Sequence, residues 1–237
     1  MDSTTKNKGN SRAVESGQTG IHPHLEAYLL KHLDSPWRQP LHPPSVTAFE
    51  SVKQILANGP EQKTPGQNDL ILDSGCGTGE STRIIASRYP QSMVIGIDRS
   101  RHRLEKTGHH GFPLRDANII WVRAELETFW RLARKENWLL SRHYLFYPNP
   151  YPKSAQLQKR WHAHPVFPSL LALGGLIEMR CNWSIYAMEF ARAIELATGV
   201  ETRHEEWQVK NPISAFERKY IASNHQLFRV IVPAGVL

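Results

Sequence analysis

From residue 70 onward, short apolar runs alternate with stretches of helical spacing. The runs fall at 70–72, 92–98, 118–124, 143–148, 175–182 and 225–233, and the helical stretches at 80–90, 99–110, 125–140 and 184–199. Continuous apolar strands separated by helices are typical of a parallel sheet that is covered on both faces. The chain therefore predicts an α/β fold, and no internal repeat suggests another architecture.

The part of the chain before this alternation has a different composition. Residues 1–20 contain almost no apolar side chains, which predicts a disordered tail. Residues 21–60 form an arm rich in His and Pro, and the helical spacing of 45–59 predicts a helix at its end. Residues 61–69 are predicted to be a loop. We expect residues 21–237 to fold as a single domain that includes this arm (21–60).

Charge and composition narrow the setting. Lys and Arg exceed Asp and Glu by seven, which fits a polyanionic partner, or simply a basic surface. No run reaches the ~18 apolar residues of a membrane span, and no secretory signal is apparent. Cys76 and Cys181 lie far apart, so we expect a reduced, cytoplasmic protein. His22 and His24 have no partner at ligand spacing, so no metal is expected.

The first predicted strand runs into Asp73 and then Ser-Gly-Cys-Gly-Thr-Gly-Glu. Gly75, Gly77 and Gly79 allow a tight turn and a close approach of the backbone to a ligand. Asp98 ends the second strand, about 20 residues later, where an acidic residue accepts from both ribose hydroxyls of a nucleotide. Glu125 follows the third strand.

The spacing of this glycine cluster is G-x-G-x-G, which differs from the dinucleotide pattern. A carboxylate at Asp73 repels phosphate but suits a cationic amino-acid group. Adenosine joined to a charged methionine describes S-adenosylmethionine, which we therefore predict as the cofactor. The alternative is a glycine-rich turn whose neighbouring acids cap helices.

The fourth strand ends in Tyr-Pro-Asn-Pro-Tyr-Pro-Lys (147–153). Proline removes a backbone donor and fixes φ, so this segment cannot continue a central strand. It instead stiffens the strand exit and presents Asn149 with little conformational freedom. A rigid turn without function is the alternative interpretation.

Several motifs together resemble the tRNA (guanine-N7)-methyltransferase family, in its bacterial single-chain form. Residues 147–153 resemble the family's F-P-D-P-W-P-K, and 214–220 (SAFERKY) resemble its T-x-Y-E-x-K-F. Asn182-Trp183 followed by Tyr186-Ala187 is similar to its T-D-W-x-x-Y-A. The resemblance covers roughly residues 45–233.

The resemblance implies a Rossmann-like class I methyltransferase, with a mostly parallel sheet, helices on both faces and an antiparallel last strand. It implies S-adenosylmethionine as cofactor, tRNA as partner, and a monomer or homodimer. It implies that Asn149 is catalytic and lies beside the methyl donor. The cofactor would be bound by Asp73, Gly75, Gly77, Gly79, Asp98, Glu125 and Asn149, and the substrate by Lys153, Asn182, Ser214, Phe216 and Glu217.

The chain also departs from the family pattern. Asn149 and Asn182 stand where the family carries Asp, and residues 154–160 lack most of its basic run. Two alternatives therefore stay open beside guanine N7. One is methylation of another nucleobase position, because Asn-Pro-Tyr is similar to the N-P-P-Y segment of exocyclic-amino methyltransferases. The other is an RNA-binding homologue with weakened catalysis.

Aromatic and basic side chains outside these motifs have simpler interpretations. The basic stretch around Arg99–Lys106 is expected to be a solvated helix face. The aromatic side chains at 121, 129, 130 and 138 are expected in the core. Tyr151 and Trp161, flanked by Pro and Lys or Arg, are better candidates for stacking on a base.

Overall fold

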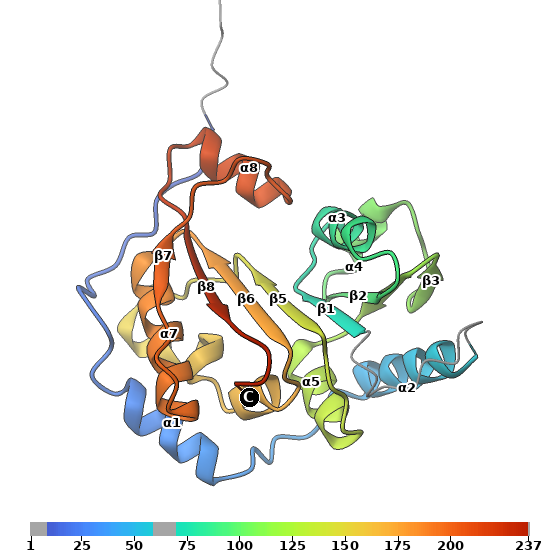
Figure 1. The fold of residues 1–237 in the computed structure, drawn as a ribbon, viewed down its shortest axis with the longest axis horizontal. Coiled ribbons are helices and arrows are strands. Elements are labelled where there is room, and N and C mark those ends of the chain that lie inside the picture. Colours follow the sequence, from blue (N-terminus) through green and yellow to red (C-terminus); the bar gives the residue numbers. More distant parts are fainter. Residues whose placement is uncertain (1–8, 59–69, 237) are drawn as a thin grey trace, which may run out of the picture.

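A computed structural model describes residues 9–58 and 70–236 (Figure 1). The eight strands form one sheet in the order β3-β4-β2-β1-β5-β6-β8-β7. Their bounds are β1 Leu70–Ser74, β2 Met93–Asp98, β3 Leu114–Asp116, β4 Ile119–Arg123, β5 Arg142–Phe146, β6 Leu176–Cys181, β7 His204–Glu206 and β8 Phe228–Val232. The predicted loop at 61–69 lies outside the described residues.

The five inner strands β4, β2, β1, β5 and β6 are parallel, and β8 runs antiparallel to β6. The predicted class I methyltransferase sheet with an antiparallel last strand is therefore confirmed. Two short antiparallel edge strands, β3 and β7, were not predicted. Each has three residues, too few for a recognisable alternation of apolar and polar side chains.

The helices are α1 Leu25–Asp34, α2 Pro43–Ala57, α3 Glu80–Arg88, α4 Arg101–Leu104, α5 Leu126–Lys135, α6 Phe167–Leu171, α7 Ser184–Thr198 and α8 Ala215–Ala222. Three 3-10 helices are η1 Glu105–Thr107, η2 Ser154–Lys159 and η3 Trp161–Ala163. Helices α3 and α4 pack on β2 and β4 on one side of the sheet, and the larger group of α1, α2, α5 and α7 lies away from them (Figure 1).

The sheet is buried on both faces, as the continuous apolar runs predict. Leu70 and Leu72 of β1 join the core shared with α2, α5 and α7, whereas Ile71 faces the core shared with α3. Trp121, Phe129, Trp130 and Trp138 are at most 1% exposed, so their assignment to the core is correct. Among the described residues, no helix is long and apolar enough to cross a bilayer.

The predicted basic helix at 99–110 is shorter than expected. Ser100 caps α4 by accepting from the backbone N–H of Arg103, and η1 follows directly. Gly108 then takes a left-handed φ of 87° and ends the helical segment. The sequence pattern predicts one longer helix because only this single glycine marks where the helical segment ends.

The N-terminal part of the chain packs on the domain from Gly9 onward. Residues 9–20 have no helix or strand, yet the N–H of Gly9 donates to the carbonyl of Ala222, and Ser16 donates to the carbonyl of Pro152. Helix α1, in the predicted arm, packs on α7. The division into a tail and one domain stays a prediction.

One buried histidine predicts how stability depends on pH. Burial lowers the pKa of His143, in β5, to about 3, so the unfolded chain takes up this proton first as the pH falls below the usual value near 6.5. By pH 5 this difference removes about 2 kcal/mol of unfolding free energy. Urea titrations at pH 7.5 and 5 should show a decrease smaller by that amount in His143→Gln than in the unmodified chain. Equal decreases would refute the assignment.

Candidate active site

A cleft of about 660 Å³ opens at the carboxyl ends of the parallel strands. Strand β1 lies between β2 and β5, so the order of strands along the chain reverses at β1. Ligands of such sheets usually bind beside this point, beyond the carboxyl ends of the strands. Five of the predicted site residues line the cleft together: Gly75, Asp98, Glu125, Asn149 and Phe216. They come from four strand exits and from α8, far apart in sequence.

The loop between β1 and α3 is held in shape by left-handed glycines. Gly75, Gly77 and Gly79 have φ values of 82°, 59° and 78°. A Cβ at Gly75 would meet no atom within 4 Å, whereas a Cβ at Gly79 would stand 2.6 Å from Thr107 and Trp121. The first glycine therefore leaves open space, and the third allows the loop to pack against the neighbouring elements.

Asp98 links this loop to the end of β2. Its Oδ2 accepts from the backbone N–H of Gly77 at 3.0 Å, and its Oδ1 accepts from the N–H of Ser100 at 2.7 Å and from Arg103 at 3.2 Å. A carboxylate offers about four acceptor positions. Asp98 thus both fixes the loop and retains acceptor capacity in the cleft that it lines.

Asp73 lies behind the glycine loop. It is 1% exposed, and its Oδ2 accepts from the hydroxyls of Ser81 and Thr82, both at 2.6 Å, in the first turn of α3. Burial raises the pKa of Asp73 to about 6, although these two hydrogen bonds oppose the shift. Its observed contacts fix the start of α3, so its predicted contact with a cofactor remains a prediction.

The segment after β5 takes an unusual backbone course. Tyr147 and Tyr151 have φ values of 53° and 44°, in the left-handed region that aromatic residues rarely adopt. The N–H of Tyr147 donates to the carbonyl of Arg180 at 2.7 Å. Between the two tyrosines, Asn149 is exposed toward the cleft. Backbone strain of this kind is concentrated at functional segments.

Helix α8 approaches the cleft from the far end of the chain. Ser214 caps it by accepting from the N–H of Glu217 at 3.1 Å. The Glu217 carboxylate is fully buried and accepts from Tyr147, Arg180 and the N–H of Ile213. Exposed Arg218 also forms a two-pronged ion pair with Glu80 at the start of α3. Both contacts hold α8 against the strand exits.

The remaining substrate candidates lie outside the part of the cleft that the described residues form. Asn182 contacts the His225 ring at 3.1 Å, and Lys153 precedes η2 on the surface. Ser214 caps α8, and the Glu217 carboxylate is occupied by Tyr147, Arg180 and the N–H of Ile213. Their roles toward a substrate, like those of Phe216 and Asn149, stay predictions.

The cleft also contains residues that the sequence did not single out. Tyr147 and Tyr220 add aromatic rings to its wall, and Gln39 and His164 come from segments without a recognisable motif. Tyr220 stands within the SAFERKY motif, so that motif was the available signal. Within the described ranges, no group of three or more His, Cys, Asp or Glu side chains is placed to bind a metal.

A family model described as "Putative methyltransferase" matches residues 67–230. The chain belongs to this methyltransferase family. The match covers the glycine loop, the proline-rich segment and α8. The resemblance to tRNA (guanine-N7)-methyltransferases is confirmed at the level of the family.

Curated relatives include two tRNA (guanine-N(7)-)-methyltransferases. The one from Nocardioides sp. is 27% identical over 67% of this chain and 64% of its own length. The one from Alkalilimnicola ehrlichii is 26% identical over 67% of this chain and 69% of its own. A trans-aconitate 2-methyltransferase from Deinococcus radiodurans matches at 46% over only 18% of the chain and 17% of its own length. The chain thus spans less than two thirds of the length of the Nocardioides and Deinococcus relatives, and 69% of the length of the Alkalilimnicola relative.

Among solved structures, one described as "Structure of an Antibiotic Related Methyltransferase" superposes with a TM-score of 0.54. It covers 84% of this chain and 97% of the other at 14% identity. At this identity the likeness supports the methyltransferase fold alone.

The glycine loop yields a paired prediction. Gly79→Ala should lower the free energy of unfolding by about 3 kcal/mol, because left-handed strain adds to a steric clash with Thr107 and Trp121. Gly75→Ala carries a similar φ but meets open space, so it should cost only about 1 kcal/mol. Urea denaturation of both variants measures the difference. Equal losses would show that the crowding at Gly79 has no energetic effect.

Two neighbouring residues on α8 should differ in their effect on the free energy of unfolding. Glu217→Ala leaves buried Arg180 without one of its two carboxylate partners, and should lower the unfolding free energy by about 3–5 kcal/mol. Phe216→Ala, at a side chain 42% exposed, should change it by less than about 1 kcal/mol. The measurement is chemical denaturation at pH 7.5. If Glu217→Ala is as stable as Phe216→Ala, Glu217 does not anchor α8.

Proposed function

We propose that this protein is an S-adenosylmethionine-dependent methyltransferase that modifies N7 of a guanine in tRNA. The observation that supports this most is the shared cleft: the candidate cofactor residues Gly75, Asp98 and Glu125 line the same cavity as Asn149. Methyl transfer requires the donor and the base within reach of each other, and a single cleft satisfies that requirement.

The residues present fit the proposed cofactor. Open space beside Gly75 gives a ligand room to approach the backbone, and Asp98 keeps acceptor capacity for ribose hydroxyls. Glu125 follows β4 at the start of α5 and lines the same cleft as Asp98. When bound, S-adenosylmethionine would supply an electrophilic methyl group on a cationic sulfur, which suits a cleft lined by three carboxylates, those of Asp98, Glu125 and Glu127.

The aromatic side chains of the cleft suit a planar base. Tyr147, Tyr151, Trp161, Phe216 and Tyr220 all line the cleft. Aromatic side chains stack on unpaired bases, and Lys159 above the Tyr151 ring, 5.8 Å from its centroid, adds positive charge at the rim. This combination favours a nucleobase over a small aliphatic acid as the methyl acceptor.

Asn149 is the candidate for orienting the base. Guanine N7 is an in-plane acceptor at neutral pH, so no strong general base is needed to begin methyl transfer. The protein's task is to align N7 with the methyl group and to exclude water. The Asn149 carbonyl would accept from the guanine N1–H and amino edge, and the rigid segment around it would limit its motion.

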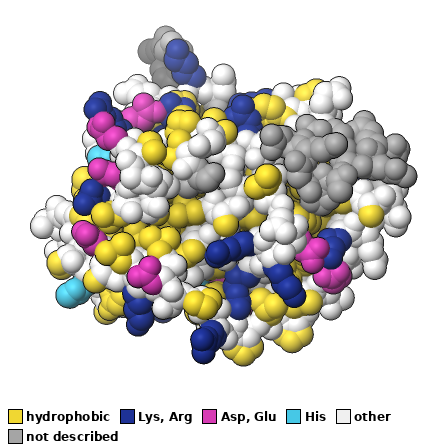
Figure 2. Space-filling view, turned by 60° about the horizontal axis from the view of Figure 1, so that its bottom comes forward, with side chains coloured by type: hydrophobic (Ala, Val, Ile, Leu, Met, Phe, Trp, Pro, Cys, Tyr) yellow, Lys and Arg dark blue, Asp and Glu magenta, His cyan; other side chains and the backbone are white. Residues whose placement is uncertain are grey.

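The substrate class rests on the relatives and on charge. The two relatives that match two thirds of this chain are named for tRNA, and the net charge of +7 suits a polyanion. Figure 2 shows Lys and Arg side chains grouped near the lower centre of one face, away from most of its acidic side chains. Such charges bind phosphates without reading sequence.

One observation favours a second candidate, methylation of an exocyclic amino group. Asn149 is followed by Pro150 and Tyr151, and its amide oxygen could accept from an amino group in the cleft. The two chemistries respond differently to charge, because a positive charge develops on the ring when N7 is methylated.

Two Asn149 variants test the proposal. Asn149→Ala should slow methylation of tRNA by roughly 10- to 100-fold while leaving S-adenosylmethionine affinity within a few-fold, since a positioning contact matters most in the transition state. Asn149→Asp should keep or raise the rate at N7, because its charge stabilises the cationic ring. Single-turnover rates and mass-spectrometric nucleoside analysis of the tRNA give the rate and the modified position.

Each result has a clear interpretation. 7-Methylguanosine formed by the unmodified chain supports the proposal, and a methylated amino group with a slower Asn149→Asp variant supports the second candidate. Wild-type turnover by Asn149→Ala would mean that the proline-rich segment is only a rigid turn. Cofactor binding without methylation of any tRNA nucleoside would overturn the proposed activity.

A further inference from the structure

The strained segment 147–153 makes its outer contacts with residues 16–22, which span the boundary between the predicted tail (1–20) and the predicted arm (21–60); we refer to these seven residues as the arm below. We propose that arm residues 16–22, acting through Gln18 and Arg160, are positioning residues that hold Asn149 in the cleft. This inference rests on the proposed function, because it concerns the orientation of Asn149. It assigns a role to a stretch that sequence composition marks as disordered.

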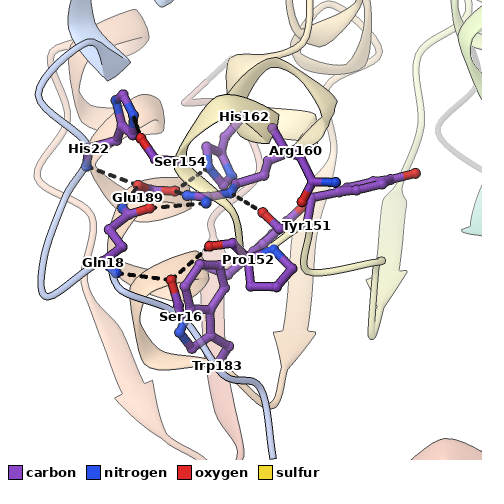
Figure 3. A network of polar contacts seen from close by, with 12 residues as sticks. Ser16, Gln18, His22, Tyr151, Pro152, Ser154, Arg160, His162, Trp183 and Glu189 are labelled. Atoms are coloured by element: carbon purple, nitrogen blue, oxygen red, sulfur yellow. Dashed lines mark hydrogen bonds and ion pairs between the residues drawn. The ribbon is translucent and has the colours of Figure 1, made fainter.

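Hydrogen bonds within its own backbone cannot fix the conformation of this segment. Pro148, Pro150 and Pro152 have no N–H to donate. Two of its carbonyls instead accept from outside: Tyr151 from Nε of Arg160 at 3.2 Å, and Pro152 from the Ser16 hydroxyl at 2.7 Å (Figure 3). These contacts lie two and three residues from Asn149, so movement of either donor would be transmitted to it.

Arg160 itself is completely buried, and all three nitrogens of its guanidinium donate hydrogen bonds. Besides Tyr151, it donates to the Glu189 carboxylate and to Oε1 of Gln18 at 3.0 Å, and it stacks on Trp183 at 4.7 Å. A planar guanidinium that makes several directional hydrogen bonds has one favourable orientation. The position of the Tyr151 carbonyl therefore depends on the groups that orient Arg160.

Gln18 bridges this pair from the arm. Its Oε1 accepts from Arg160, while its Nε2 donates to Glu189 and to the Gly20 carbonyl. Glu189 also accepts from the N–H of His22 at 2.9 Å and from His162 at 2.9 Å. His22 in turn contacts the Ser154 hydroxyl at 2.7 Å, just after the segment (Figure 3). The arm thus contacts the chain on both sides of Lys153, at Pro152 within the segment and at Ser154 just after it.

Removing Gln18 should loosen the segment without unfolding the protein. Glu189 keeps Arg160 and His162, and the apolar core does not include Gln18. The guanidinium loses one of its orienting partners, and a water molecule can replace the amide. Displacements of about 1 Å in a reacting group can cost 10²-fold in rate.

The test uses the full chain with Gln18→Ala and Ser16→Ala. Hydrogen–deuterium exchange of peptides spanning 144–160 should be faster in both variants, since the amides at 147, 149, 151 and 153 report on the segment. Methylation of tRNA at saturating cofactor should fall by about 10-fold for Gln18→Ala. The dissociation constant for S-adenosylmethionine should stay within two- to three-fold.

Matched substitutions serve as controls. Gln54→Ala removes an exposed glutamine from α2, across the molecule from the arm, and should change neither exchange nor rate (Figure 1). Ser16→Thr retains the hydroxyl and should restore most of the loss seen in Ser16→Ala.

The outcomes separate this inference from the proposed function. Faster exchange at 144–160 without methylation of tRNA by the unmodified chain would overturn the activity and leave the positioning contact supported. Unchanged exchange in Gln18→Ala would refute the inference, whatever the substrate. A parallel loss of thermal stability, cofactor affinity and rate would also refute it, because that pattern indicates a general structural role.

Discussion

The ion pair between Arg160 and Glu189 is the interaction on which the geometry of the site depends. Both side chains are wholly buried, and moving two charges out of water is costly unless further hydrogen bonds satisfy them. Burial by itself would raise the pKa of Glu189, but the contacts with His162 and Arg160 lower it to about 2. Glu189 therefore stays ionised at neutral pH. The groups that make hydrogen bonds to the pair come from the arm, α7, η3 and the exit of β5, and each must occupy a fixed place.

A second buried ion pair acts on the other side of the same exit. Arg180 lies between Glu178 and Glu217, and Glu217 also accepts from Tyr147. Segment 147–153 is thus held at its first residue by the pair from β6 and α8, and near its last residues by Arg160, which lies between η2 and η3, and its partner Glu189 in α7. Two independent polar networks can maintain left-handed tyrosines that neither prolines nor local hydrogen bonds would stabilise.

The sequence predicted the sheet because its signal is local and repeated. Apolar runs such as 92–98 and 118–124 indicate parallel strands. The glycines and acidic residues at the strand ends indicate where the cleft lies. The contacts of Glu217 were not predictable, because the sequence of the motif is the same whether this residue faces a ligand or is buried against Arg180. Nor were the contacts of Gln18 and His22, since pairing across 132 to 171 residues leaves no periodic pattern in a polar segment.

These constraints bear on the amide at Asn149. In the proposed reaction, an aspartate there would offset charge developing on the methylated ring, whereas asparagine would only orient the base. A neutral side chain acts only through its position, and a displacement of about 1 Å is enough to lose that effect. The three prolines, the two strained tyrosines and the buried pairs on either side all restrict that geometry. The substitution and the rigid surroundings are therefore compatible: a residue that acts by position alone requires a segment that does not move.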